Sequence, residues 1–493
     1  MPEISIAKSL ADMTSGGNGA DSVAVDQTSP PPLRPGEEAL WLHLDNLAAE
    51  SDRVRREEGR FDDFDHYLDM FYGKHWPTTM PTFRPPIVAN ELRTLILSEA
   101  SDLTEAQLRI YITKNPTVKS ARDEDLERAF RAIWVREQVD LKLLYSCCWA
   151  LICGTGFVST SWNPDAHHGF GDVEIVDVDP RTVLPDVDCI DDRKWLYVIR
   201  EQVLDIPELR RLFPNSGWRV RPEDRWSVKG QGRHSGPEGL SSSVYLGPLT
   251  PGGSTFGSAF GYKKARARVL DCLLHDDSVE ESFEEIQGID GRPVHDANGN
   301  ALLHHTVTAK YPNGRRIVGA NGVILYDGNN PNPGGDFGLL RVILEPALGR
   351  FWGSGFVHQT AELQLAADKG LSSNVENALR LNNGIVVATT NTGLDFETFA
   401  GIPAQVVQIS PGSDFKIIYP PPMPPDMVNF PFMCLDLQRR LLGFPDPRIG
   451  VGGHGNVSPE LTETEIAQAQ SATRLRARML YYTVQRLAEM IFA

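Results

Sequence analysis

The sequence contains no long hydrophobic run: nowhere among its 493 residues do eighteen or more apolar residues follow one another. A helix needs about twenty such residues to cross the hydrocarbon core of a membrane, so no membrane span is predicted. The start, Met1-Pro2-Glu3 followed by an acidic stretch with Ser and Gly, has no apolar core of a secretory signal. We therefore expect a protein that stays in the cytoplasm and has no membrane partner.

Cysteine is scarce, and no cysteine spacing matches a paired metal-binding motif. The chain has six: Cys147, Cys148, Cys153, Cys189, Cys272 and Cys434. They lie in apolar or mixed surroundings, and we interpret them as free thiols.

Motifs for nucleotide binding and nucleophilic catalysis are also missing. Residues 257–263 (GSAFGYK) superficially resemble a phosphate-binding loop but lack the Gly-Lys-Ser/Thr ending and the strand-to-helix context. No Gly-x-Ser-x-Gly elbow occurs. His275-Asp276-Asp277 and His304-His305 offer metal-ligand chemistry, yet adjacent histidines on a strand point to opposite faces. We expect no enzyme and no cofactor, and a metal-dependent hydrolase built on these clusters is only the third hypothesis.

One acidic segment is dense enough to suggest a cation site. Asp186, Asp188, Asp191 and Asp192 lie close together in the sequence. Oxygen-rich loops of this kind bind divalent cations. The non-functional interpretation, an acidic patch on the surface, is favoured. Asp186, Asp188 and Asp191 are therefore weak metal candidates.

Positive charge is in deficit, because 48 Lys and Arg against 65 Asp and Glu give a net charge of −17. A protein that grips DNA concentrates Lys and Arg where it meets the phosphates. A surface past which DNA slides needs the opposite, since long-lived phosphate contacts would act as brakes. The charge argues against a DNA-gripping protein and is compatible with a channel.

What the sequence does contain is a series of helical and β patterns from His358 to the end. Residues 358–383 are predicted to form a helix of about 39 Å, longer than a small core requires, which indicates a mechanical role. Its expected apolar stripe is Leu363, Ala367, Leu371, Val375 and Ala378. Short β-rich runs between 384 and 419, ending at three prolines from Pro420, predict a small β module.

A second helix is predicted at about 426–442, and it carries two apolar stripes. The first is Val428, Phe432, Leu435 and Leu442, and the second is Phe430, Cys434, Leu437 and Leu441. Two stripes indicate neighbours on two sides of the helix. Pro431 is expected to kink this helix or to occupy its first turn.

A glycine- and proline-rich segment follows at 444–457, and its composition is incompatible with regular structure. A final helix is predicted from Ser458, which is a suitable N-cap, with Pro459 at the first helical position and Glu460 favouring the dipole. Its apolar stripe is Ile466, Ala469, Leu480, Val484, Leu487 and Ile491, and its other face carries Arg474, Arg478, Tyr482, Gln485 and Glu489.

The part before residue 358 has a different pattern. Residues 1–36 hold few large apolar residues and are predicted to be a disordered arm. One or two amphipathic helices are expected at 37–71, and one long helix with a buried inner end at 123–153. Short strands and loops are expected at 173–342, with the Gly- and Ser-rich segment 229–261 as a flexible insertion. We predict a mixed α/β region at 37–357.

Several different short motifs follow one another in a specific order along the chain. Phe71-Tyr72-Gly73-Lys74-His75-Trp76 and Ile87-Val88-Ala89-Asn90 come first, then Gly154-Thr155-Gly156 between Trp149 and Trp162, Val176-Asp177-Val178-Asp179-Pro180, Leu184-Pro185-Asp186, Glu208-Leu209-Arg210-Arg211-Leu212-Phe213-Pro214, Tyr311-Pro312-Asn313-Gly314-Arg315 and Phe351-Trp352-Gly353-Ser354-Gly355. With the helix, β module, helix, loop and helix that follow, they make residues 37–493 resemble the portal proteins of tailed bacteriophages.

The resemblance implies an α+β portal fold with a mixed α/β wing (37–357), two stem helices (358–383 and 425–443) flanking a small β-rich clip (384–424), a tunnel loop (444–457) and a long C-terminal helix near the wing and crown (458–493). It implies a homo-oligomeric ring of roughly twelve copies at one capsid vertex of the virion, through which double-stranded DNA is packaged and ejected. The implied partners are the packaging terminase and later the head-completion or adaptor proteins at the clip, and capsid and scaffold proteins at the wing.

The resemblance also implies roles for individual residues. The tunnel-loop residues expected next to DNA are Arg448, Gly452, Gly453, His454, Gly455 and Asn456. The stem residues are the sparse cations Lys369, Arg380, Arg439 and Arg440, which could steer DNA, and Leu435 and Leu437, which are expected between subunits. A different phage head-tail connector or adaptor is the alternative function, and the order of helix, clip, helix and loop favours the portal.

Overall fold

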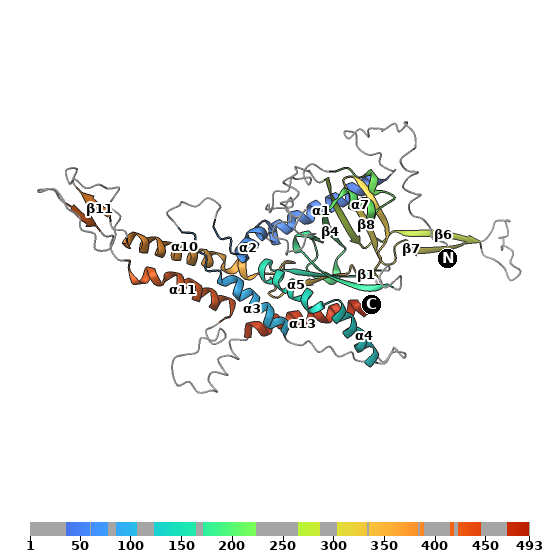
Figure 1. The fold of residues 1–493 in the computed structure, drawn as a ribbon. Helices are drawn as coiled ribbons and strands as arrows, with labels where there is room; N and C mark the ends of the chain where they lie inside the picture. Colours follow the sequence, from blue (N-terminus) through green and yellow to red (C-terminus); the bar gives the residue numbers. More distant parts are fainter. Residues whose placement is uncertain are drawn as a thin grey trace, which may run out of the picture.

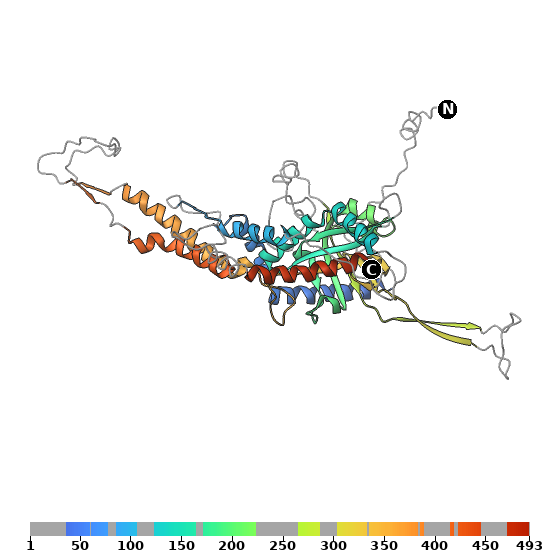
Figure 2. The same ribbon diagram turned by 90° about the horizontal axis from the view of Figure 1, so that it is seen from below.

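The computed structural model describes residues 36–59, 61–76, 85–105, 123–163, 171–222, 265–285, 303–332, 335–382, 385–388, 415–418, 423–444 and 471–492. It is an α+β structure with antiparallel sheets, as predicted. A central body carries a pair of long helices that projects at one end and a narrow two-stranded ribbon that projects at the other (Figure 1, Figure 2). Within the described residues, no helix combines the length and the apolar character needed to cross a membrane.

The largest sheet of the described residues has the strand order β3-β4-β5-β8-β9. Its strands are β3 (Val183–Pro185), β4 (Tyr197–Asp205), β5 (Arg266–Leu274), β8 (Arg315–Ala320) and β9 (Val323–Asn329). Alternate residues of β5 are buried on opposite faces. Leu270 packs with Leu44 of α1 (Glu37–Gly59) on one face, and Val269 packs with Leu209 of α7 (Ile206–Leu212) on the other.

The second sheet has the order β10-β1-β2, formed by β10 (Leu339–Val342), β1 (Gly156–Asn163) and β2 (Asp172–Val178). It contributes Val158, Ile175 and Leu340 to the main hydrophobic core. The helices that complete this core are α2 (Phe64–Phe71), α3 (Glu91–Glu105), α5 (Val139–Cys153) and α13 (Ser471–Phe492). The two helices expected at 37–71 are therefore present as α1 and α2.

The prediction of a single long helix at 123–153 is wrong. The structure has α4 (Asp123–Arg136) and α5, separated at Gln138, whose φ of 50° is left-handed and breaks the helical path. The break allows α5 to enter the core while α4 stays at the surface, where Phe130 packs on Phe492. The expected burial of the inner end is confirmed, since Cys147 and Leu151 are 0% and 1% exposed.

Two of the glycine-containing motifs meet where α5 turns into β1. Gly154 caps α5 with a φ of 91°, and a Cβ added there would lie 2.3 Å from the carbonyl oxygen of Gly353. A Cβ on Gly355 would likewise lie 2.5 Å from the carbonyl oxygen of Ile152. Thr155 accepts a hydrogen bond from the Gly353 amide over 2.9 Å. Glycine is needed at these positions because the two backbones touch.

Smaller elements connect these layers. They are the 3-10 helices η2 (Phe61–Asp63), η3 (Pro180–Thr182), η4 (Asp192–Lys194) and η5 (Gly217–Arg219), and the projecting ribbon of β6 (Val279–Glu285) and β7 (Leu303–Ala309). The ribbon pairs in antiparallel register, with Phe283 opposite His305.

The opposite projection is a helical hairpin that we call the stalk. It consists of α10 (Phe356–Asn382), the short pair β11 (Ile385–Ala388) and β12 (Phe415–Ile418), and α11 (Pro425–Leu442). Figure 1 shows α10 and α11 side by side, with β11 beyond their far ends. Pro431 lies inside α11 and not in its first turn, and it packs so closely that a Cβ on Gly370 would lie 2.7 Å from its ring. The absence of a side chain on Gly370 thus lets the helices approach.

Candidate functional site in the stalk and its base

The inward face of α10 is polar, which contradicts the apolar stripe predicted from the sequence. Of that stripe, only Ala367 is fully buried, and Val375 is 38% exposed. The residues that are buried instead follow one another at four-residue spacing: Thr360, Gln364, Asp368, Ser372 and Glu376. They lie on one helical face. The pattern was misleading because the neighbours of this face come from distant parts of the chain.

Asp368 is the centre of this polar face. Its Oδ2 contacts Nδ1 of His75, and its Oδ1 accepts a hydrogen bond from the Ala89 amide over 2.9 Å. The other ring nitrogen of His75 lies 2.8 Å from the Met70 carbonyl oxygen. Both side chains of the ion pair are fully buried. Since both ring nitrogens face acceptors, the charged imidazolium satisfies the geometry.

The pKa of His75 reflects these contacts. Burial by itself lowers the pKa, but the hydrogen bonds to Asp368 and to the Met70 carbonyl, together with the Asp368 charge, raise it above its ordinary value. The fold therefore favours the protonated ring of His75 more than water does.

Two further contacts complete this attachment. Ser372 accepts a hydrogen bond from the Ile87 amide over 3.1 Å, and Gln364 donates to the Ala89 carbonyl over 2.6 Å. Asn90 caps α3 by accepting from the Arg93 amide over 3.1 Å. The motifs that contain His75 and Ala89 therefore meet the stalk helix directly. We call His75, Ala89, Gln364, Asp368 and Ser372 the polar clamp.

Arg476 of α13 forms a second buried centre at the base of the stalk. Its guanidinium donates to Glu99 over 3.1 Å, to Glu345 over 2.9 Å and to the Leu442 carbonyl over 3.2 Å. Glu99 belongs to α3 and Leu442 ends α11, so one side chain joins α13, α3 and the stalk. Sequence reasoning missed Arg476 and Asp368. The only sequence signal for these two residues was a charged side chain next to a predicted apolar stripe.

Replacing Arg476 with Met is expected to lower the free energy of unfolding by about 3–5 kcal/mol, because Glu99 keeps its buried charge and loses this partner. Arg478→Met on the exposed face of the same helix is the matched control and should change stability by less than about 0.5 kcal/mol. Urea denaturation followed by circular dichroism measures both. Equal losses of unfolding free energy in the two variants would show that Arg476 does not stabilise the base of the stalk.

The outer helix of the stalk, α11, buries one face against α10 and exposes apolar residues on both sides of it. The buried face is Pro431, Cys434, Leu435, Gln438 and Leu442. On one flank lie Phe430, Leu437 and Leu441, which are 41%, 47% and 55% exposed, and on the other lie Val428 and Phe432, which are 42% and 59% exposed. The two predicted stripes are corrected accordingly: Cys434, Leu435 and Leu442 pack inside the chain, and the other five residues form two exposed flanks.

The four predicted stem cations differ in their surroundings. Arg439 contacts Glu91 and lies 3.5 Å from Asp436, so it is engaged within the chain and is not an unpaired steering charge. The Arg440 side chain is 72% exposed, 3.8 Å from Asp436, and Lys369 is also exposed. The side chain of Arg380 lies outside the described residues. Of the three predicted stem cations whose side chains the structure describes, Lys369 and Arg440 therefore face solvent.

The predicted tunnel loop lies outside the described residues apart from Phe444, and so do Arg448, Gly452, Gly453, His454, Gly455 and Asn456. The start of the last helix at Ser458 is outside them too. The flanks of this segment are described. Gly443 caps α11 with a φ of 82°, and a Cβ on it would lie 3.0 Å from Cβ of Ala472 in α13. The described residues on the two sides of this segment, Gly443 and Ala472, therefore lie next to each other.

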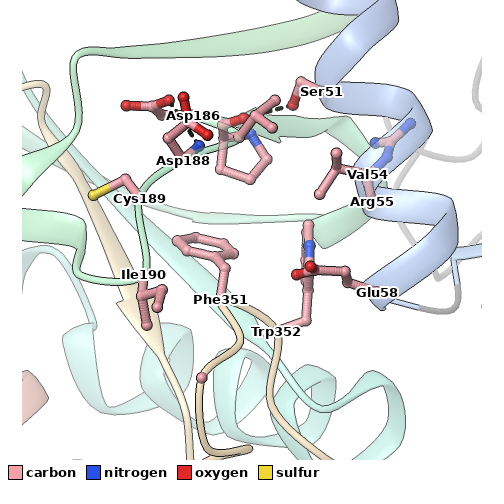
Figure 3. Close-up of a pocket in the computed structure, with 13 residues that line it drawn as sticks. Ser51, Val54, Arg55, Glu58, Asp186, Asp188, Cys189, Ile190, Phe351 and Trp352 are labelled. Atoms are coloured by element: carbon pink, nitrogen blue, oxygen red, sulfur yellow. Dashed lines mark hydrogen bonds between the residues drawn. The ribbon is translucent and has the colours of Figure 1, made fainter.

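The acidic segment lines a pocket of about 220 Å³ between α1 and the chain that follows β3 (Figure 3). Asp186 accepts hydrogen bonds from the amides of Asp188 (3.2 Å) and Leu196 (2.9 Å). Asp191 accepts from the Arg193 amide over 3.2 Å and caps η4. These carboxylates stabilise separate turns. In the described part of the chain, no three His, Cys, Asp or Glu residues gather as a metal site.

The His and Asp clusters that suggested a hydrolase have other contacts. Asp276 pairs with Arg315 over 2.9 Å and accepts from the Ser278 amide, also over 2.9 Å. Although burial raises the pKa of Asp276, these hydrogen bonds hold it below its ordinary value. His305 lies on the ribbon, 3.2 Å from Glu281 and stacked on Phe283. The arrangement does not converge on a reaction centre.

A comparison of the sequence with protein-family models gives no match, and a comparison with curated proteins also gives none. The interpretation of the stalk therefore depends on its own residues and their contacts.

Proposed function

We propose that this protein is a ring-forming portal subunit of a tailed bacteriophage, which provides the channel for double-stranded DNA at one capsid vertex. The observation that carries the proposal is the stalk: a long hairpin, clamped at its base, whose outer helix exposes one apolar flank on each side. Aliphatic and aromatic side chains in this number are seldom left in water along a projecting helix.

The two flanks are different surfaces, which points to a second copy of the chain as the partner. Phe430, Leu437 and Leu441 of one copy can pack on Val428 and Phe432 of the next, so each copy uses both flanks. Such head-to-tail contacts generate a closed ring when the rotation between copies is constant. The outward side between the flanks carries the charged residues Asp436 and Arg440 together with Met433, which is 64% exposed.

The other parts of the chain take roles around this ring. The polar clamp and Arg476 hold the stalk at a fixed angle to the body, which is the wing. The β11–β12 end is the clip, where the packaging terminase docks and is later replaced by head-completion proteins. Capsid and scaffold proteins contact the wing. The tunnel loop (444–457) contacts DNA. Gly443 and Ala472, described residues on either side of the loop, lie beside each other at the base of the stalk. The protein acts in the virion as a passive channel and not as an enzyme.

Sedimentation velocity of the purified chain tests the proposal. We expect one dominant species at roughly twelve times the chain mass of 54.6 kDa. A monomer or a two-fold dimer at micromolar concentration would contradict it, because neither uses both flanks of α11 in a closed series.

Shortening the segment between Gly450 and Gly455 is expected to leave ring formation intact and to lower the amount of DNA packaged or retained. The reason is that the two ends of this segment are fixed beside each other at Gly443 and Ala472, so the ring contacts do not depend on its length. Sedimentation reports assembly, and nuclease-protected DNA per particle reports packaging. Unchanged packaging in assembled rings would leave the segment as a plain connector.

A further inference from the structure

The exposed face of α13 carries two arginines, Arg474 and Arg478, and one acid near its end, Glu489, in a chain that is acidic overall. The helix contains four arginines and one glutamate, a net charge of +3, whereas the whole chain carries −17. Arg474 and Arg478 lie one turn apart on the exposed face, and neither forms an ion pair with a described residue. Arg476 and Arg486, by contrast, are paired with acidic residues of the body.

Aromatic and polar groups continue the same face. Tyr481 and Tyr482 are 51% and 56% exposed. Gln485 is exposed one turn further on, where its amide donates a hydrogen bond to Glu489 over 3.4 Å. The helix positions its opposite face, with Leu480, Val484 and Leu487, in the main core, so the exposed side chains are held on a rigid element. We call Arg474, Arg478, Tyr481, Tyr482 and Gln485 the α13 stripe.

The chemistry of the α13 stripe matches a phosphate backbone. Arginine binds phosphate oxygens with two parallel hydrogen bonds, and tyrosine and glutamine side chains also donate to them. From Arg474 to Gln485 the stripe is about 17 Å long, which corresponds to about half of one helical turn of a duplex along its axis. Contacts to the phosphate backbone carry no base information, so the proposed contact is independent of sequence.

The position of the stripe agrees with this ligand. α13 begins beside the end of α11, where Gly443 approaches Ala472, and Figure 2 shows α13 running along the surface of the body as a continuation of the stalk. If the stalk borders the DNA path, the stripe borders the same path on the body side of the stalk base.

We propose that the α13 stripe binds the phosphate backbone of double-stranded DNA inside the ring, beyond the stalk base. This inference rests on the proposed channel function. With two arginines per copy, each contact is weak, yet repetition around the ring keeps the duplex centred in an otherwise acidic lumen. The stripe therefore guides DNA without holding it at one register.

The test compares three assembled proteins: the unmodified chain, Arg474→Gln/Arg478→Gln, and the control Arg210→Gln/Arg211→Gln. The control removes the same charge from exposed positions of α7. Fluorescence anisotropy with a short labelled DNA duplex is measured over a series of salt concentrations, and sedimentation velocity is run on the same samples.

The stripe variant is expected to form the same oligomer and to bind the duplex about tenfold more weakly at low salt. Its salt slope should be shallower by about 0.9 for each phosphate that the variant no longer neutralises. The control should match the unmodified chain. Equal binding by all three proteins would contradict DNA binding by the α13 stripe. Failure of only the stripe variant to assemble would also contradict it, because the face would then be a subunit contact. If the unmodified chain is monomeric, the proposed channel fails, and the same affinity comparison still decides the stripe.

Discussion

Replacing Leu437 and Leu441 with Asp is expected to give a folded, soluble chain that no longer assembles into rings. The two side chains are 47% and 55% exposed on one flank of α11, so charging them costs little in the single chain. In a ring they would be buried against the next copy, and each unpaired carboxylate there would cost several kcal/mol. Sedimentation velocity gives the oligomeric state, and circular dichroism confirms that the helices are intact.

Leu435→Asp is the contrasting variant on the same helix. Leu435 is 8% exposed and packs with Ala367 and Cys434 between α10 and α11, so a charge there should destabilise the stalk itself by about 3 kcal/mol or more. Of the two leucines predicted to lie between subunits, Leu435 packs inside the chain and Leu437 is exposed. Full rings from the Leu437→Asp/Leu441→Asp variant would exclude this flank from the interface.

Removing the carboxylate of the polar clamp, by Asp368→Ala, is expected to lower the free energy of unfolding by about 3–5 kcal/mol. The change leaves the His75 ring buried without its ionic partner and the Ala89 amide without its acceptor. Glu362→Ala is the matched control, an exposed acid on the same helix. Urea denaturation measures both, and similar losses would show that Asp368 has no special role in the attachment.

The clamp also predicts a pH dependence. The pKa of His75 is higher in the folded chain than its ordinary value of 6.5, so folding favours the protonated ring. Its contribution to stability is fully present below about pH 6.5 and is lost as the pH rises through the raised folded pKa. The stability difference between the unmodified chain and His75→Gln should therefore shrink on going from acidic to alkaline pH. A constant difference would contradict a protonated His75.

The helices of the stalk could be predicted from the sequence because their signals are local. The predicted bounds 358–383 and 425–443 differ by at most two residues from the observed bounds Phe356–Asn382 and Pro425–Leu442. A left-handed Gly443 ends α11. The motif Gly154-Thr155-Gly156 lies at the junction of α5 and β1, where the close backbones require glycine at Gly154.

The contacts of the base could not be predicted, because their partners are far apart in the sequence. Asp368 lies 293 residues from His75, and Arg476 lies 377 residues from Glu99. Helical periodicity reports which residues share a face but not what covers it. The predicted apolar stripe through Leu363 and Leu371 therefore missed the face with Gln364 and Asp368, which the distant clamp residues bury.

The acidic segment is a second case in which the sequence pattern does not reveal the contacts of its residues. Four aspartates within a short stretch suggest a cation site, but Asp186 and Asp191 each accept amide hydrogen bonds in separate turns. Composition cannot distinguish carboxylates that converge from carboxylates that cap turns. The structure makes that distinction through individual donors and acceptors.

Electron microscopy of the purified chain tests the central claim most directly. The portal assignment predicts class averages with closed rotational symmetry, a central channel wide enough for a DNA duplex, and neighbouring stalks in contact through the two flanks of α11. Isolated chains, two-fold dimers or open filaments without a channel would contradict it.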